Sequence, residues 1–123
     1  MTAIARPRVF IVEDEFLIAM SIEDVVQELG YEVIGPVARF DDALRVAKTA
    51  EIDVAILDVS LDRGQLVFPV AEVLRTRSIP FAFLTAYGRE ILDSHFRDRR
   101  IIEKPFDGGV LARCLRELTN GVR

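Results

Sequence analysis

The stretch EIDVAILDVSLDRG, residues 51–64, decides the fold. Its centre, residues 53–58, is an apolar run that ends on a carboxylate, Asp58. An unbroken apolar run of this length is typical of a central parallel strand that is covered on both faces. Burial of a charged group costs free energy unless it is paired. The residues that surround the end of this strand should therefore explain why a carboxylate stands there.

Four further runs of strand character lie on either side of residues 53–58. Strands are predicted at residues 8–13, 31–37, 80–85 and 100–104, and Gly35 and Pro36 place the second of them at a sheet edge. Helical segments separate the runs, with short connections. Five such units predict an α/β fold, a doubly wound five-stranded parallel sheet with helices on both faces and the flavodoxin-like strand order 2-1-3-4-5.

The helices are predicted from apolar residues spaced three and four apart. The first helix ends at Gly30, the second is capped by Asp41 and runs to about Ala50, the third covers residues 68–77, and a short fourth helix with a weaker pattern covers residues 88–96. The inward positions are Ile18, Ile22, Val25 and Leu29, then Leu44 and Ala47, and finally Leu111, Cys114, Leu115 and Leu118 in the last helix.

Composition limits the possible classes of function. With 123 residues, 50% of them hydrophobic, the chain is expected to form one domain over residues 1–123 with no output domain after it. A formal net charge of −4 argues against nucleic-acid or anionic-lipid binding, since both need clustered Lys and Arg. Cys114 is the one cysteine, and no stretch is long enough for a membrane span or signal peptide, so a cytoplasmic location is expected.

Polar residues stand at the ends of four predicted strands. In parallel sheets of this kind, ligands bind at the carboxyl ends of the strands. We therefore expect one cleft to collect these side chains, which are Glu13, Asp14 and Glu15, then Asp58, Thr85, and Glu103 with Lys104 and Pro105.

Clustered carboxylates repel one another, and Glu13, Asp14 and Asp58 need a cation among them. An all-oxygen donor set favours Mg²⁺ over zinc, which would need His or Cys. A divalent cation, a lysine and a hydroxyl together can neutralise a phosphoryl group during transfer, and Asp58 can be the nucleophile.

With these residues in this order, the chain resembles the receiver domain of bacterial two-component response regulators over nearly its whole length. The resemblance rests on VFIVEDE (9–15), VAILDVSL (54–61), FLTAYG (83–88) and EKPF (103–106). It implies that Asp58 accepts a phosphoryl group, that Thr85 and Lys104 contact that group, and that Pro105 sets the geometry of the lysine through a cis peptide bond.

The resemblance also implies a metal site for Mg²⁺ or Mn²⁺. Asp14 and Asp58 would be direct ligands, Glu13 would act mainly through water, and the backbone carbonyl of Ser60 would complete the protein ligands. Glu13 departs from the usual pair of aspartates. Its longer side chain is expected to shift the metal or its waters.

A second departure concerns the switch. The aromatic residue expected three positions before the lysine is Ile101, which has no ring to move when Thr85 moves. The segments FAFLTAYG (81–88) and VFPVAEVL (67–74) resemble a receiver subgroup with a Phe-Ala-Thr-Gly-X-Tyr stretch, with Ala86 in place of the glycine. In that interpretation Tyr87 is the moving aromatic. Tyr87 and Ser60 also flank the path of attacking water, which favours a persistent acyl phosphate.

The implied partners are a sensor histidine kinase or a histidine phosphotransfer protein. A downstream protein target or a second copy of the chain would bind the face of helix 4, strand 5 and helix 5. The protein would act by phosphorelay, as a phosphate sink or by allosteric binding of a partner. It would not be an enzyme beyond self-phosphorylation and slow autodephosphorylation. Two alternatives stay open: a pseudo-receiver that binds a partner without phosphorylation, and a Mg²⁺-dependent phosphatase, for which Ser60 is not the second acid required.

Single residues also have simpler interpretations. Glu15 is expected to complement the dipole of the first helix, and Asp58 alone could be a turn residue. His95 is expected on the surface and Cys114 in the core.

Overall fold

Residues 54–58 form the central strand of a five-stranded parallel sheet with the order β2-β1-β3-β4-β5, as predicted. The computed structural model describes residues 6–120, so the two ends of the expected domain over residues 1–123 lie outside the described residues. The strands are β1 (Arg8–Val12), β2 (Glu32–Val37), β3 (Val54–Asp58), β4 (Phe81–Thr85) and β5 (Arg100–Glu103). The α-helices are α1 (Phe16–Glu28), α2 (Phe40–Thr49), α3 (Phe68–Thr76) and α4 (Gly108–Asn120).

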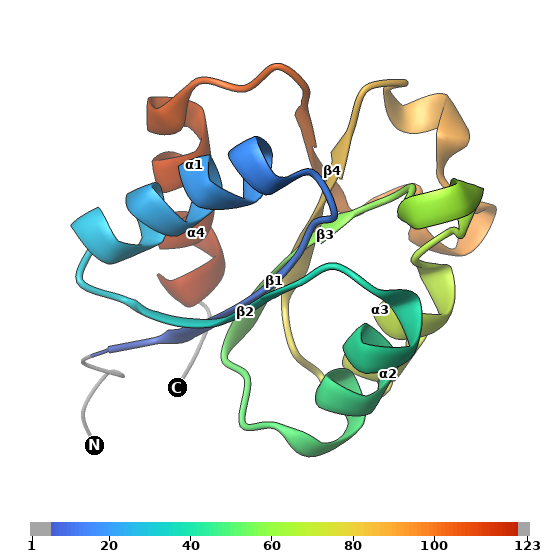
Figure 1. Cartoon of the computed structure of the whole chain (residues 1–123), viewed down its shortest axis with the longest axis horizontal. Coiled ribbons are helices and arrows are strands. Elements are labelled where there is room, and N and C mark those ends of the chain that lie inside the picture. Colours follow the sequence, from blue (N-terminus) through green and yellow to red (C-terminus); the bar gives the residue numbers. More distant parts are fainter. Residues whose placement is uncertain (1–5, 121–123) are drawn as a thin grey trace.

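Helices cover both faces of the sheet (Figure 1). Successive side chains of a strand point to opposite faces, so β1 supplies Val9 and Ile11 to the core beneath α1 and α4, and Phe10 and Val12 to the core beneath α2 and α3. Every residue of β3 is buried, which explains why the four residues before Asp58 are all apolar. Cys114 lies in the first of these cores, as predicted.

β2 is the edge strand that Gly35 and Pro36 predict. Gly35 has φ of +100°, and a Cβ placed there would lie 2.7 Å from the backbone nitrogen of Val37 and 3.0 Å from the carbonyl oxygen of Ile11. Only glycine fits this close approach. The pairing of β1 with β2 is irregular between Phe10 and Val12, beside this site.

Two helix ends test the capping predictions. α1 ends where Gly30 takes φ of +80°, as expected for a glycine that follows a helix. The cap predicted at Asp41 is wrong, because α2 begins at Phe40 and Arg39 occupies the capping position. Phe40 packs against the core, and this contact places the helix start two residues earlier. Asp41 instead lies in the first turn, where a carboxylate still complements the helix dipole.

The short helix predicted over residues 88–96 is also wrong. The segment forms two 3₁₀ turns, η2 (Arg89–Ile91) and η3 (Ser94–Phe96). Leu92 and Asp93 between them are extended, and the carboxylate of Asp93 accepts a hydrogen bond from the amide of His95. Such a local bond competes with a continuous helix.

The ring of Phe96 anchors this segment to the core. It stacks on Phe68 at a centroid distance of 5.7 Å and makes edge contacts with Phe83 at 5.6 Å and Phe81 at 6.1 Å.

The same segment is also held by Arg89, which donates hydrogen bonds to the carbonyls of Arg97 and Arg99. His95 is exposed, as predicted. Among residues 6–120, no helix is long and apolar enough to cross a lipid bilayer.

Candidate functional site

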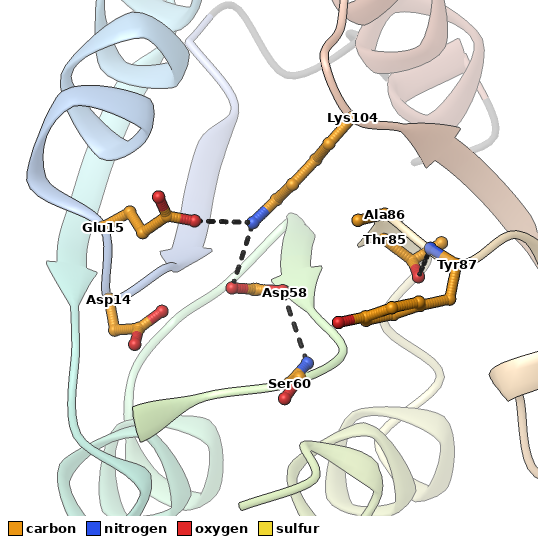
Figure 2. A pocket seen from close by; sticks show the side chains of 8 residues that line it. All are labelled: Asp14, Glu15, Asp58, Ser60, Thr85, Ala86, Tyr87 and Lys104. Atoms are coloured by element: carbon orange, nitrogen blue, oxygen red, sulfur yellow. Dashed lines mark hydrogen bonds and ion pairs between the residues drawn. The ribbon is translucent and has the colours of Figure 1, made fainter. Parts of the chain in front are cut away.

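The polar residues at the carboxyl ends of β1, β3, β4 and β5 meet in one cleft of about 330 Å³ (Figure 2). Backbone hydrogen bonds hold neighbouring strand ends side by side: the amide of Val59 donates to Leu84 at 3.0 Å, and the amide of Lys104 donates to Thr85 at 2.9 Å. The lining residues are Asp14, Glu15, Asp58, Ser60, Thr85, Ala86, Tyr87 and Lys104. Apart from Glu15, all of these were candidates for a functional role on sequence grounds.

Asp58 lies at the floor of the cleft with only 4% of its surface exposed. Its Oδ2 is 3.3 Å from the Nζ of Lys104, and its Oδ1 accepts a hydrogen bond from the amide of Ser60 at 3.3 Å. Burial raises the pKa of the Asp58 carboxyl, and the charge of Lys104 opposes this rise. Asp58 is thus a fixed carboxylate that faces a cleft in which an electrophile can reach it.

Glu13 lies behind the cleft wall and is almost completely buried, with 2% exposed. Its Oε2 accepts a hydrogen bond from the amide of Glu15 at 3.1 Å, whereas its Oε1 accepts none and has only the ion pair with Lys104 at 3.2 Å. Burial and the nearby charge of Asp58 raise the pKa of Glu13 to about 7. The buried cluster therefore has an excess of negative charge when both carboxyls are ionised.

Lys104 is the cation of this cluster. Its ammonium lies 3.2 Å from Glu13, 3.3 Å from Asp58 and 3.5 Å from Glu15. Burial acts to lower the pKa of Lys104, but Asp58 and Glu13 together outweigh it and raise that pKa. The peptide bond from Lys104 to Pro105 is cis, as the resemblance implies.

The loop after β4 covers the other side of the cleft. Thr85 is buried, and its hydroxyl oxygen accepts a hydrogen bond from the amide of Tyr87 at 3.0 Å. The hydroxyl proton of Thr85 therefore remains available to an acceptor in the cleft. Tyr87 is 69% exposed, and its ring lies across from Asp58 and Ser60, with its hydroxyl directed toward them (Figure 2).

Ile101, the candidate at the expected switch position, lies outside the cleft. It pairs with Phe83 in the sheet and packs, partly buried, against the core beneath α2 and α3. The aromatic cluster of Phe81, Phe83 and Phe96 occupies that core. The side chain at position 101 is thus part of the packed interior.

The donor atoms fit a hard divalent cation. Glu13, Asp14 and Asp58 each offer a carboxylate oxygen, and these oxygens lie within 4.8 Å of one another. The buried Glu13 Oε1 accepts no hydrogen bond, and the described residues place no His or Cys in this group. Oxygen-only donors with one open side suit Mg²⁺ or Mn²⁺ and do not suit zinc.

Glu15 lines the cleft, as its place after the first strand predicts, but its contact with Lys104 was not predicted. Its side chain makes no capping hydrogen bond to α1 and contacts Lys104 instead. The sequence signal was present, because a third acidic residue follows Glu13 and Asp14, but the pattern does not show which way an exposed side chain turns.

Comparison with known proteins agrees with this geometry. Residues 9–116 match the response regulator receiver domain family. The solution structure of SdrG from Sphingomonas melonis superimposes with a TM-score of 0.82 and 42% identity, over 96% of this chain and 98% of that one. A second solution structure of SdrG shows its BeF3-activated conformation, with a TM-score of 0.77 and the same identity, over 97% of this chain and 99% of that one.

Two further relatives are more distant. The receiver domain of the sensor histidine kinase PA1611 from Pseudomonas aeruginosa, with a magnesium ion in its active-site cleft, is 25% identical with a TM-score of 0.80, over 94% of this chain and 99% of that one. The transcriptional regulatory protein PdtaR of Mycobacterium tuberculosis is 31% identical over 105 residues, which are 85% of this chain and 47% of PdtaR. The chain thus spans about half the length of this curated relative. From its fold, the residues at its strand ends and these matches, the chain belongs to the family of response regulator receiver domains of two-component systems.

Proposed function

We propose that this receiver domain accepts a phosphoryl group on Asp58 from a histidine-phosphorylated kinase or phosphotransfer protein. The observation that carries the proposal is the Lys104 ammonium, which lies 3.3 Å from the buried Asp58 in a cleft that Thr85 also lines. A cation and a hydroxyl beside one carboxylate suit a dianionic group at that carboxylate.

The transfer follows from the orientation of Asp58. One of its carboxylate oxygens attacks the phosphorus of the donor, the bond from phosphorus to the donor imidazole nitrogen breaks, and the imidazole leaves with its electron pair. The product is an acyl phosphate on Asp58. Lys104 and the hydroxyl of Thr85 are then the donors available to the phosphoryl oxygens.

Asp14, Asp58 and the backbone carbonyl of Ser60 would hold a Mg²⁺ or Mn²⁺ ion, with Glu13 behind them. When bound, such an ion neutralises charge on the carboxylates and on the transferring phosphoryl group. The magnesium-bound receiver domain of PA1611 supports this assignment. The role of Glu13, which would contact the ion through a water molecule, is part of the proposal.

The readout is proposed to use Tyr87 and the loop after β4. The Thr85 hydroxyl oxygen accepts a hydrogen bond from the Tyr87 amide at 3.0 Å. A phosphoryl group that accepts a hydrogen bond from the same hydroxyl would therefore act directly on the loop. Ala86 and Gly88 flank Tyr87, and Gly88 has φ of +75°. Ile101, fixed in the core, would take no part in the switch.

The output surface would be the face formed by η2, η3, β5 and α4, which replaces the helix 4, strand 5 and helix 5 face expected from the sequence. A protein target or a second copy would bind there, in the cytoplasm. The domain would relay the phosphoryl group, drain a kinase or bind its target allosterically, with no catalysis beyond self-phosphorylation and slow autodephosphorylation.

The test is incubation with Mg²⁺ and phosphoramidate, followed by intact mass of the wild type and of Asp58→Asn. A single added phosphoryl group in the wild type that is absent from the variant is the expected result. Release of phosphate without any phosphorylated protein would indicate the phosphatase instead.

No reaction under these conditions would indicate the pseudo-receiver. One observation favours that second candidate: Ile101, at the position where a switch aromatic is expected, packs against the core. Partner binding that Asp58→Asn leaves unchanged would support it.

A further inference from the structure

The Lys104 ammonium contacts one carboxylate that the phosphorylation chemistry does not use. Glu15 Oε1 lies 3.5 Å from Lys104 Nζ, and the Glu15 side chain is 64% exposed whereas that of Lys104 is 14% exposed. Figure 2 shows Glu15 and Asp58 on either side of the ammonium, which bridges the rim and the floor of the cleft. Glu15 is thus the outermost of the three carboxylates around this lysine.

The backbone explains why Glu15 takes this position. Glu15 immediately precedes α1 in an extended conformation, with φ of −85° and ψ of 117°, and its side chain does not cap the helix. Its amide is satisfied by Glu13 Oε2 at 3.1 Å. Because the backbone is fixed by a buried residue, the side chain starts from a defined point on the rim and extends across the cleft.

A phosphoryl group on Asp58 would change the charge balance around Lys104. Before phosphorylation, one ammonium is shared among Glu13, Asp58 and Glu15. Afterwards a dianion attached to Asp58 needs the same ammonium. Since Lys104 carries one positive charge, a contact kept with Glu15 weakens its contact with the phosphoryl oxygens.

We propose that Glu15 is a positioning residue that holds the Lys104 ammonium toward the rim and competes with the phosphoryl group for it. The proposal rests on the proposed function of Asp58. It predicts that Glu15 lowers the stability of the phosphorylated state and so sets how much of it accumulates. For a pair with one exposed partner the effect is modest, about two- to fivefold in affinity.

The experiment measures the affinity for BeF3⁻ in saturating Mg²⁺, by NMR titration of the intact chain. Glu15→Gln should bind about two- to fivefold more tightly than the wild type. Glu28→Gln is the matched control, because Glu28 is the exposed last residue of the same helix and lies away from the cleft. Its affinity should equal that of the wild type, and equal gains in both variants would overturn the proposal.

A second comparison separates competition for Lys104 from simple repulsion. In a Lys104→Met background, Glu15→Gln should leave the BeF3⁻ affinity unchanged, since no ammonium remains to be shared. The same gain in both backgrounds would overturn the proposal. A third measurement keeps Lys104 unchanged and follows the NMR signal of its Nζ in the metal-free protein. Glu15→Gln should shift this signal, and Glu28→Gln should not.

Failure of the proposed function would give a different pattern. Wild type that binds no BeF3⁻ would overturn the role of Asp58 and the competition together. Wild type that binds normally while Glu15→Gln matches it would overturn the role of Glu15 alone.

Discussion

In the absence of metal, the stability of this domain should fall as the pH rises from 5 to 8. The cause is Glu13, which is 2% exposed and whose pKa is raised from 4.5 to about 7 by burial and by the charge of Asp58. A carboxyl whose pKa is raised on folding binds its proton more tightly in the folded state. Its stabilising contribution is therefore fully present below the unfolded pKa and is lost as the pH rises through the folded pKa.

The magnitude follows from the two pKa values. A rise from 4.5 to about 7 corresponds to a loss of about 3 kcal/mol over the whole titration, at about 1.4 kcal/mol per pH unit. Part of this loss occurs below pH 5, so about 2 to 3 kcal/mol should be lost between pH 5 and pH 8. Asp58 adds to the loss, because burial raises its pKa as well.

The assay is urea unfolding with EDTA at four pH values from 5 to 8, with Glu13→Gln as the control. The variant cannot ionise at position 13, so its free energy of unfolding should depend far less on pH. Saturating Mg²⁺ should remove the fall in the wild type, because the ion favours the ionised carboxylates. The reasoning would be refuted if wild type and Glu13→Gln showed the same pH dependence in EDTA.

Three more predictions concern other parts of the molecule. Phe96→Ala should lower the free energy of unfolding by about 3 kcal/mol in chemical denaturation, since it removes a buried ring from an aromatic cluster; a loss below about 1 kcal/mol would mean that the ring does not anchor its segment. Arg77→Ala should cost about 1 to 2 kcal/mol in the same assay, because its guanidinium donates to the carbonyls of Ala47 and Ala50 at the end of α2; a cost equal to that of an exposed control, Arg45→Ala, would contradict this. Tyr87→Glu should shorten the lifetime of the acyl phosphate, followed by loss of radiolabel, because the ring lies across the cleft from Asp58; a slower loss would show that Tyr87 does not shield the site.

The fold was predictable because burial determines it. The strands that form the sheet are apolar runs, and the residue that ends each run must lie at the same edge once the strands are parallel. This geometry alone placed Asp58, Thr85 and Lys104 in one cleft.

The sequence did not predict features that depend on local competition. Leu92 and Phe96 are four residues apart and both buried, a spacing that also suits a helix, but the Asp93 carboxylate bonds a nearby amide and interrupts it. The direction of the Glu15 side chain depends on the distant Lys104, which no local pattern reveals.

The two edges of the sheet have a consequence for solubility at high concentration. An exposed strand edge can template a strand from another molecule unless something interrupts it. In β2, Pro36 lacks an amide proton and Gly35 takes a φ of +100°, which departs from a regular strand, while β5 is four residues long with the charged Arg100 and Glu103 at its ends. Strand-to-strand growth into fibrils is thus disfavoured at both sides of the sheet, and the exposed strand edges are poor sites for self-association.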